Sequence, residues 1–144
     1  MSKIIIAIGS DHAGFAMKLS FLKNFEMADV EFIDLGTDND ASCDYPVFAK
    51  KVCESVTNGD CTFGLLICGT GIGMSMAANK IKNIRAAVAH DVFSAKFTRL
   101  HNDANVLCLG ARVIDKNLAF ELLEIFIKTE FEGGKHSKRI AQFE

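Results

Sequence analysis

The feature that most constrains the fold of this chain is the alternation of short, continuous apolar runs with longer segments of helical periodicity. Runs such as IIIAI (4–8) and FGLLI (63–67) are typical of strands that are buried on both faces of a sheet. The longer segments repeat apolar residues every three or four positions, which favours helices. The expected strands are 3–8, 30–35, 63–67, 85–89 and 105–110, and the expected helices are 14–25, 44–56, 74–81, 91–100 and 115–131.

Strands that alternate with helices form right-handed βαβ units and a parallel sheet with helices on both faces. The sequence therefore predicts a Rossmann-like α/β fold, a three-layer α/β/α sandwich around a five-stranded parallel sheet, as a single domain over residues 1–144. In such sheets, ligands bind at the carboxyl ends of the strands. The residues that follow the strands are the candidates: Asp11 and His12 after the first, CGTGIG (68–73) after the third, His90 and Asp91 after the fourth, and Arg112 after the fifth.

Charge and cysteine usage exclude several classes of protein. The formal net charge is −2, so no basic footprint predicts a nucleic-acid partner. The first apolar run is too short for a signal peptide or a membrane span, so we expect a cytoplasmic protein without a membrane partner. The cysteines are odd in number and form no C-x-x-C pair, which predicts neither a disulfide framework nor a zinc site. Cys53 and Cys108 are expected as small buried side chains, and Cys43 and Cys61 in loops.

The loop CGTGIG has its glycines at alternate positions. A dinucleotide fingerprint, G-x-G-x-x-G, would need glycine where Met74 stands, and a P-loop would need a lysine that is also missing. Asp91, about twenty residues further on, is the one point that favours a dinucleotide. Alternating glycines expose successive backbone N–H groups, and such a nest at a helix N-terminus binds an anion. The alternative is a tight turn that holds no ligand.

Cys68 stands at the edge of this loop. A thiol near a helix N-terminus ionises more readily, and the thiolate can attack as a nucleophile or take a proton as a base. A base beside an anion nest suits the removal of a proton next to a carbonyl, because the N–H groups hold the resulting enediolate. Transfer of a proton between two adjacent carbons in this way is aldose–ketose isomerisation.

Other side chains fit a phosphorylated sugar, since arginine, lysine and histidine clamp phosphates. For three of the polar features a structural interpretation stays open. The segment KHSKR (135–139) is also typical of a solvated helix face, His101 is also typical of a helix end, and His12 is also typical of a surface loop. The phosphate candidates are His12, Arg112, Lys135, His136 and Arg139, and the candidates for sugar hydroxyls are Asp11 and Asn102.

Longer stretches of the chain match a known family. On these stretches the chain resembles the type B ribose-5-phosphate isomerases, in the family that also contains galactose-6-phosphate and allose-6-phosphate isomerases. The resemblance implies a metal-independent isomerase without a cofactor that interconverts D-ribose 5-phosphate and D-ribulose 5-phosphate in the pentose phosphate pathway. The matching stretches, in family order, are SDHAGF (10–15), DYP (44–46), ICGTGIGMSMAANK (67–80), IRAAV (84–88), HNDANVLCLGARV (101–113) and FEGGKHSKR (131–139).

The resemblance also implies roles for single residues. Cys68 would move the proton between C1 and C2 with Thr70 alongside, and His101 would help to open the sugar ring. Family members are homodimers or dimers of dimers with shared active sites, so the C-terminal basic segment would reach the partner subunit. Many relatives carry arginine at the position of Lys135, and lysine lacks the paired N–H donors with which arginine binds a phosphate bidentately. The backbone of Gly69, Gly71, Ile72 and Gly73 would hold the enediolate, Asp11, Tyr45 and Asn102 would contact sugar oxygens, and His12, Arg112, Lys135 and Arg139 would bind the phosphate.

Three other functions stay open from the sequence. The chain could be an allose-6-phosphate or galactose-6-phosphate isomerase. The substrate of such an enzyme has one more carbon between the proton that the base removes and the phosphate, and the sequence does not reveal the distance from the base to the phosphate-binding residues. A non-catalytic nucleotide- or flavin-binding module would fit the expected sheet, although the glycine spacing speaks against it. A thiol redox sensor at Cys68 would need an exposed resolving cysteine, and none is close in sequence.

Overall fold

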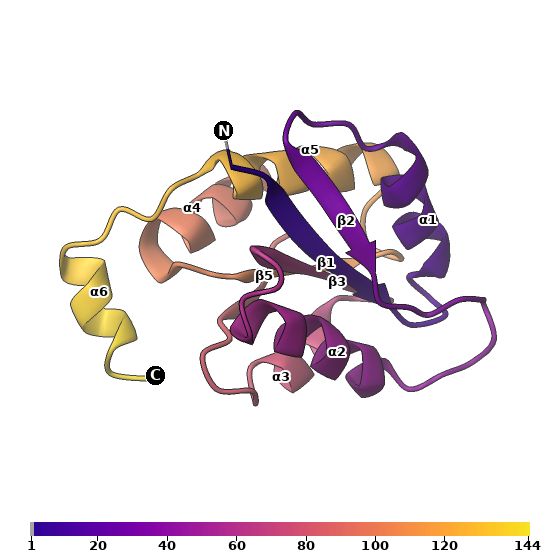
Figure 1. Cartoon of the computed structure of the whole chain (residues 1–144), viewed down its shortest axis with the longest axis horizontal. Coiled ribbons are helices and arrows are strands. Elements are labelled where there is room, and N and C mark those ends of the chain that lie inside the picture. The colour runs from indigo at the N-terminus through magenta and orange to yellow at the C-terminus, as the bar shows by residue number, and fades with distance from the viewer. Residues whose placement is uncertain (1) are drawn as a thin grey trace.

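The computed structural model describes residues 2–144 and contains a five-stranded sheet between two layers of helices (Figure 1). The strand order is β2-β1-β3-β5-β4, and each neighbouring pair is parallel. Within residues 2–144, no helix is long and apolar enough to cross a membrane. The strands are β1 (Ile4–Ser10), β2 (Val30–Asp34), β3 (Phe63–Cys68), β4 (Ala86–Val88) and β5 (Val106–Gly110).

The helices divide between the two faces of the sheet. One apolar cluster joins the sheet to α1, α4 and α5, and a second joins it to α2 and α3. A short last helix, α6, stands apart from both layers in Figure 1. The helices are α1 (Phe15–Asn24), α2 (Tyr45–Thr57), α3 (Ile72–Ala78), α4 (Val92–Asn102), α5 (Lys116–Lys128) and α6 (Lys135–Ile140).

The central strands hold the core because their side chains are buried on both faces. Along β3, Leu65 and Ile67 belong to the cluster under α1 and α5, whereas Leu66 belongs to the cluster under α2 and α3. All three side chains are 0% exposed. Burying a side chain of this size stabilises the fold by roughly 1.5–3 kcal/mol. The loops that leave these strands therefore start from a rigid scaffold.

Several helix ends differ from the expected positions. Asp115 caps α5, since its Oδ1 accepts a hydrogen bond from the Leu118 N–H at 2.9 Å. Asp44 occupies the N-cap position of α2, but its side chain accepts no cap hydrogen bond. The helix expected over 74–81 begins at Ile72 because Gly71, with φ of 81°, forms the turn that starts it. The helix expected to end at residue 131 ends at Lys128, where the following residue is extended.

Candidate active site

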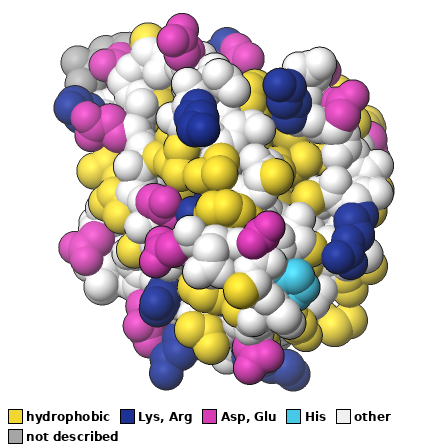
Figure 2. Space-filling view, turned by 90° about the vertical axis from the view of Figure 1, so that its right-hand side faces the viewer, with side chains coloured by type: hydrophobic (Ala, Val, Ile, Leu, Met, Phe, Trp, Pro, Cys, Tyr) yellow, Lys and Arg dark blue, Asp and Glu magenta, His cyan; other side chains and the backbone are white. Residues whose placement is uncertain are grey.

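The carboxyl ends of β1, β3 and β5 lie side by side and gather three loops. Ser10 pairs with Ile67 and Cys68 pairs with Gly110 in the sheet register. The loop after β1 packs directly on β3, because a Cβ on Gly14 would lie 2.4 Å from the carbonyl oxygen of Ile67. Figure 2 shows this side of the molecule, where charged side chains surround patches of hydrophobic ones. We call the group of residues at these strand ends the strand-end site.

Cys68 and the glycine loop form the centre of the strand-end site. Cys68 is the last residue of β3, and its side chain is 5% exposed. Its Sγ accepts a hydrogen bond from the Gly71 N–H at 3.1 Å, and Thr70 Oγ1 accepts one from the Ile72 N–H at 3.2 Å. The first N–H groups of a helix lack intrahelical acceptors, so the start of α3 presents further donors next to this sulfur.

Two longer side chains flank the loop. The ring of Tyr45 lies over Gly73, since a Cβ on that glycine would be 2.8 Å from the ring's Cζ. The guanidinium of Arg112 lies beside Gly69, where a Cβ would be 3.1 Å from Nη1. The Arg112 N–H also donates to the Gly69 carbonyl at 3.0 Å. The guanidinium of Arg112 and the phenol of Tyr45 therefore border the glycine loop that follows the thiol.

The loop after β1 supplies an acid and a base. Asp11 is 7% exposed, and its Oδ1 accepts a hydrogen bond from the Gly14 N–H at 3.1 Å. His12 Nδ1 accepts a hydrogen bond from the Cys43 N–H at 3.3 Å. A ring nitrogen that accepts carries no proton, so the His12 proton is on Nε2. The buried Ser10 Oγ, which the sequence interpretation did not single out, has no hydrogen-bond partner among residues 2–144.

The remaining predicted residues lie at the opposite edge of the sheet. Helix α4 begins beyond the carboxyl end of β4 and ends where β5 begins, so His101 and Asn102 lie at the amino ends of the strands. Asn102 lines a cavity of about 500 Å³ together with Lys80, Arg85 and Phe143. Lys135 and Arg139 are exposed on α6, which contacts α4 on this side through the stacked rings of His136 and His101. One protomer does not bring these four residues to Cys68.

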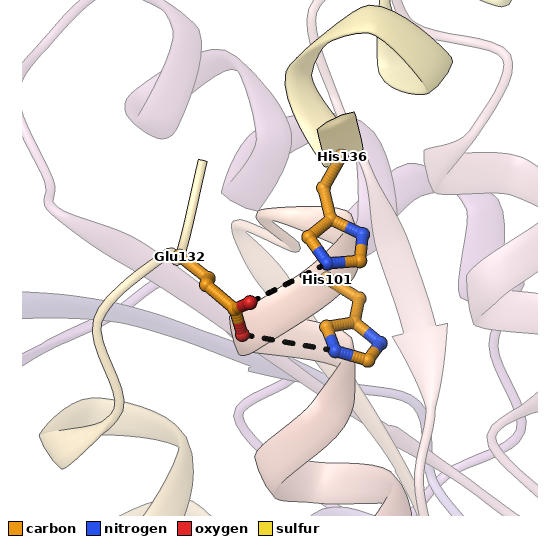
Figure 3. A group of neighbouring side chains, drawn as sticks. All are labelled: His101, Glu132 and His136. Atoms are coloured by element: carbon orange, nitrogen blue, oxygen red, sulfur yellow. Dashed lines mark ion pairs between the residues drawn. The ribbon is translucent and has the colours of Figure 1, made fainter. Parts of the chain in front are cut away.

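His101 has two neighbours that the sequence interpretation did not connect with it. Its ring stacks on that of His136, with centroids 4.0 Å apart and planes at 13°. A Glu132 oxygen lies 3.8 Å from Nε2 of each histidine (Figure 3). Burial, and next the nearby His101, lowers the pKa of His136. The four-residue spacing of Glu132 and His136 is a sequence signal, but their contact with His101 depends on how the chain folds back after α5.

Comparison with known proteins gives the family. The sequence model of the Ribose/Galactose Isomerase family matches residues 6–143. The chain belongs to this family.

Named relatives resemble the chain over almost its whole length. A putative sugar phosphate isomerase of Bacillus subtilis is 49% identical over 138 residues, which cover 95% of this chain and 93% of that protein. Ribose-5-phosphate isomerase B of Escherichia coli is 42% identical over 135 residues, 94% of this chain and 91% of that protein. The solved structure of Clostridium thermocellum ribose-5-phosphate isomerase B has a TM-score of 0.93 at 45% identity and covers 96% of this chain and 94% of that chain. The predicted fold class is thereby confirmed.

The thiols of the chain differ in their surroundings. Burial raises the pKa of Cys53 to about 12 and also raises the pKa of Cys61 and of Cys108. These three side chains are therefore held as neutral thiols at neutral pH. Cys53 and Cys108 are buried, and Cys43 and Cys61 lie in loops, as predicted. Cys68 is also buried, and it is distinguished from these thiols by its place at the glycine loop.

The residues after β4 have structural roles. Asp91 Oδ1 accepts a hydrogen bond from the Ser94 N–H at 2.7 Å, so this carboxylate caps α4. That hydrogen bond lowers the pKa of Asp91. The capping role accounts for an aspartate at this position without a nucleotide ribose. Asp91 was the one sequence feature that favoured a dinucleotide, so it no longer supports that interpretation.

His90 is expected to make the stability of the protein dependent on pH. Its Nε2 accepts a hydrogen bond from the Gly110 N–H at 2.8 Å, and burial lowers its pKa below the ordinary 6.5. The folded state then disfavours the protonated ring, so stability is complete above pH 6.5 and falls as the pH drops through the lowered value. Urea unfolding of wild type and His90→Gln should show a smaller loss of stability in the variant between about pH 7 and 5. Equal slopes in the two proteins would contradict this role.

Proposed function

We propose that this protein is an aldose–ketose isomerase that interconverts D-ribose 5-phosphate and D-ribulose 5-phosphate. The observation that carries the proposal is the position of the Cys68 thiol against the N–H groups at the start of α3. The names of the Escherichia coli and Clostridium thermocellum relatives support the substrate. The enzyme would need no metal and no organic cofactor. Its buried and half-buried free cysteines fit a reducing compartment, so the proposed location is the cytoplasm.

The proton transfer runs between two adjacent carbons of the open-chain sugar. The Cys68 thiolate takes the proton from C2 of the aldose, and negative charge develops on O1 as the C1–C2 double bond forms. The N–H groups of the glycine loop and the start of α3 would stabilise this enediolate, and each well-placed donor contributes roughly 3–4 kcal/mol. The Cys68 thiol then gives this proton to C1, and the O2 proton is transferred to O1 as the C2 carbonyl forms, which gives the ketose and restores the thiolate. Thr70 lies beside this path.

The substrate would be held by groups around the thiol. Asp11 and Tyr45 would contact sugar oxygens, and the Nε2 proton of His12 and the guanidinium of Arg112 would face the phosphate. His101 would transfer the proton that opens the furanose ring, Asn102 would contact the open sugar, and Lys135 and Arg139 would complete the phosphate clamp.

These last four residues belong to the opposite edge of the sheet, so the proposed enzyme is a homodimer with active sites shared between subunits. The carboxyl-edge group of one protomer would meet the α4 and α6 group of the other. Large hydrophobic side chains on α3 and near the start of α4 support an interface, since Met76 is 65% exposed and Phe93 is 67% exposed. A second dimer association, giving a dimer of dimers, is part of the same proposal.

The function is tested by the reaction itself. Purified protein is incubated with ribose 5-phosphate in deuterated water, with chelator present, and ribulose 5-phosphate and deuterium at the exchanged carbon are measured. Ketose formation with chelator present, and with solvent deuterium in product or recovered substrate, is the expected result. Turnover of allose 6-phosphate or galactose 6-phosphate in its place would move the substrate to six carbons. Inactivity on all three sugars would contradict an isomerase.

A further inference from the structure

Three ligand-type side chains meet beside α4, outside the strand-end site. His101 comes from the last turn of α4, Glu132 from the segment after α5, and His136 from the start of α6 (Figure 3). One ligand atom from each lies within 4.8 Å of the other two. The group therefore joins three separate elements of the chain at one point.

Ion pairing alone accounts poorly for this arrangement. Each Glu132 oxygen lies 3.8 Å from a histidine Nε2, which is longer than an N–H···O hydrogen bond. Two stacked imidazoles would repel each other if both carried charge, and Glu132 is 56% exposed, where an ion pair contributes little. Two imidazoles and a carboxylate whose ligand atoms lie within 4.8 Å of one another are instead a ligand set that proteins use for zinc.

We propose that His101, Glu132 and His136 bind one divalent transition-metal ion of the zinc type, and that the bound ion withdraws His101 from ring opening. Metal binding stands on this geometry, whereas the inhibition rests on the proposed isomerase function. Imidazole and carboxylate ligands suit zinc, cobalt and nickel rather than calcium or magnesium. The ion is thus an inhibitor and not a cofactor.

The three side chains can close on an ion with small movements. Zinc lies about 2.0–2.2 Å from imidazole nitrogen and carboxylate oxygen, so the ligand atoms must approach one another and the nearly parallel rings must splay. The His136 side chain is 8% exposed, so the packing around it restricts its movement. His101 and Glu132 are 39% and 56% exposed and have room to turn. A water molecule or the sugar would occupy the fourth position.

The binding test uses cobalt(II), whose visible spectrum reports the type and number of ligands. The assembled wild-type protein should take up one ion per chain, with no charge-transfer band of a cobalt–thiolate bond. Glu132→Gln and His136→Gln should each weaken cobalt binding at least about tenfold. Loss of a residue that only hydrogen-bonds to a metal ligand already lowers metal affinity by about that factor, and loss of a ligand itself should lower it no less. Glu130→Gln, two residues away and also exposed, is the matched control and should bind as wild type.

The outcomes of the cobalt titration are decisive without any activity measurement. Thiolate bands, equal affinity in Glu132→Gln and wild type, or no binding at millimolar cobalt would each overturn the metal site. Inhibition is measured separately, with zinc, and each variant is compared with its own metal-free rate. Zinc should inhibit wild type and Glu130→Gln at lower concentrations than Glu132→Gln. Equal zinc inhibition of all three proteins would show that zinc acts at another group and would overturn the inhibitory role. If the wild type is inactive on every sugar phosphate, the proposed function fails, but the cobalt titration still tests the metal site.

Discussion

Replacing Cys68 by alanine is expected to lower kcat for ribose 5-phosphate by a factor on the order of 10²–10⁴, the contribution of a positioned acid or base. The thiol is the group at the glycine loop that can accept the substrate proton, and its Sγ already contacts the Gly71 N–H. KM should change less, because Asp11, His12 and Arg112 remain. Steady-state formation of ribulose 5-phosphate gives both constants, and circular dichroism shows whether the variant folds.

Two further variants make the Cys68 result specific. Cys68→Ser keeps an oxygen that can accept from Gly71, but a hydroxyl does not ionise at neutral pH, so this variant should be as inactive as Cys68→Ala. Cys61→Ala removes another buried thiol, just before the amino end of β3, and should retain the wild-type rate. A folded Cys68→Ala protein that keeps more than about a tenth of wild-type kcat would show that the thiol is not the base.

Mixing two inactive variants is expected to restore activity if the site is shared. Cys68→Ala lacks the proposed base and His101→Gln lacks the ring-opening group, and the two positions lie at opposite edges of the sheet. In a two-fold dimer, random reassembly makes half of the dimers mixed, and each mixed dimer has one site with both groups intact. The rate should therefore recover to about a quarter of wild type. Isomerase assays after joint refolding from denaturant measure it.

A second mixture is the control for recovery. Cys68 and Arg112 belong to the same edge, so refolding Cys68→Ala with Arg112→Ala leaves a defect in every site and should restore nothing. Mass spectrometry of the intact dimers confirms that subunits have exchanged. Mixed dimers of Cys68→Ala and His101→Gln that stay inactive would contradict a site shared between subunits.

The sequence predicted the strands and layers because burial on both faces of a parallel sheet leaves a strong pattern. FGLLI is apolar at every position, and the structure explains why, since Leu65 and Leu66 face opposite helix layers. Boundaries that depend on single backbone angles were less well predicted. Helix α3 starts earlier than expected because Gly71 adopts a positive φ, and composition does not encode which glycine of CGTGIG does so.

The strand-end site could be predicted because topology alone brings strand ends together. Asp11, Cys68 and Arg112 lie at or just after the ends of different strands, and the parallel order places those ends at one edge of the sheet. The contact of His101 with Glu132 and His136 could not be predicted in this way. It depends on how the segment after α5 turns back over α4, where the Glu132 N–H donates to the Leu100 carbonyl at 3.0 Å. The spacing of apolar residues in the sequence does not indicate that this segment turns back over α4.

The separation of α6 from the helix layers has a thermodynamic consequence. This helix has 6 residues and His136 as its buried side chain, far short of the length at which helices are stable alone in water. In a lone protomer its order depends on the stacked imidazoles and on the Arg85–Glu144 ion pair beyond its end. Segments held by so few contacts open at a free-energy cost well below that of global unfolding. Lys135 and Arg139 are therefore carried on a locally unstable segment, and a neighbouring subunit would set how much of the time their charges are in position.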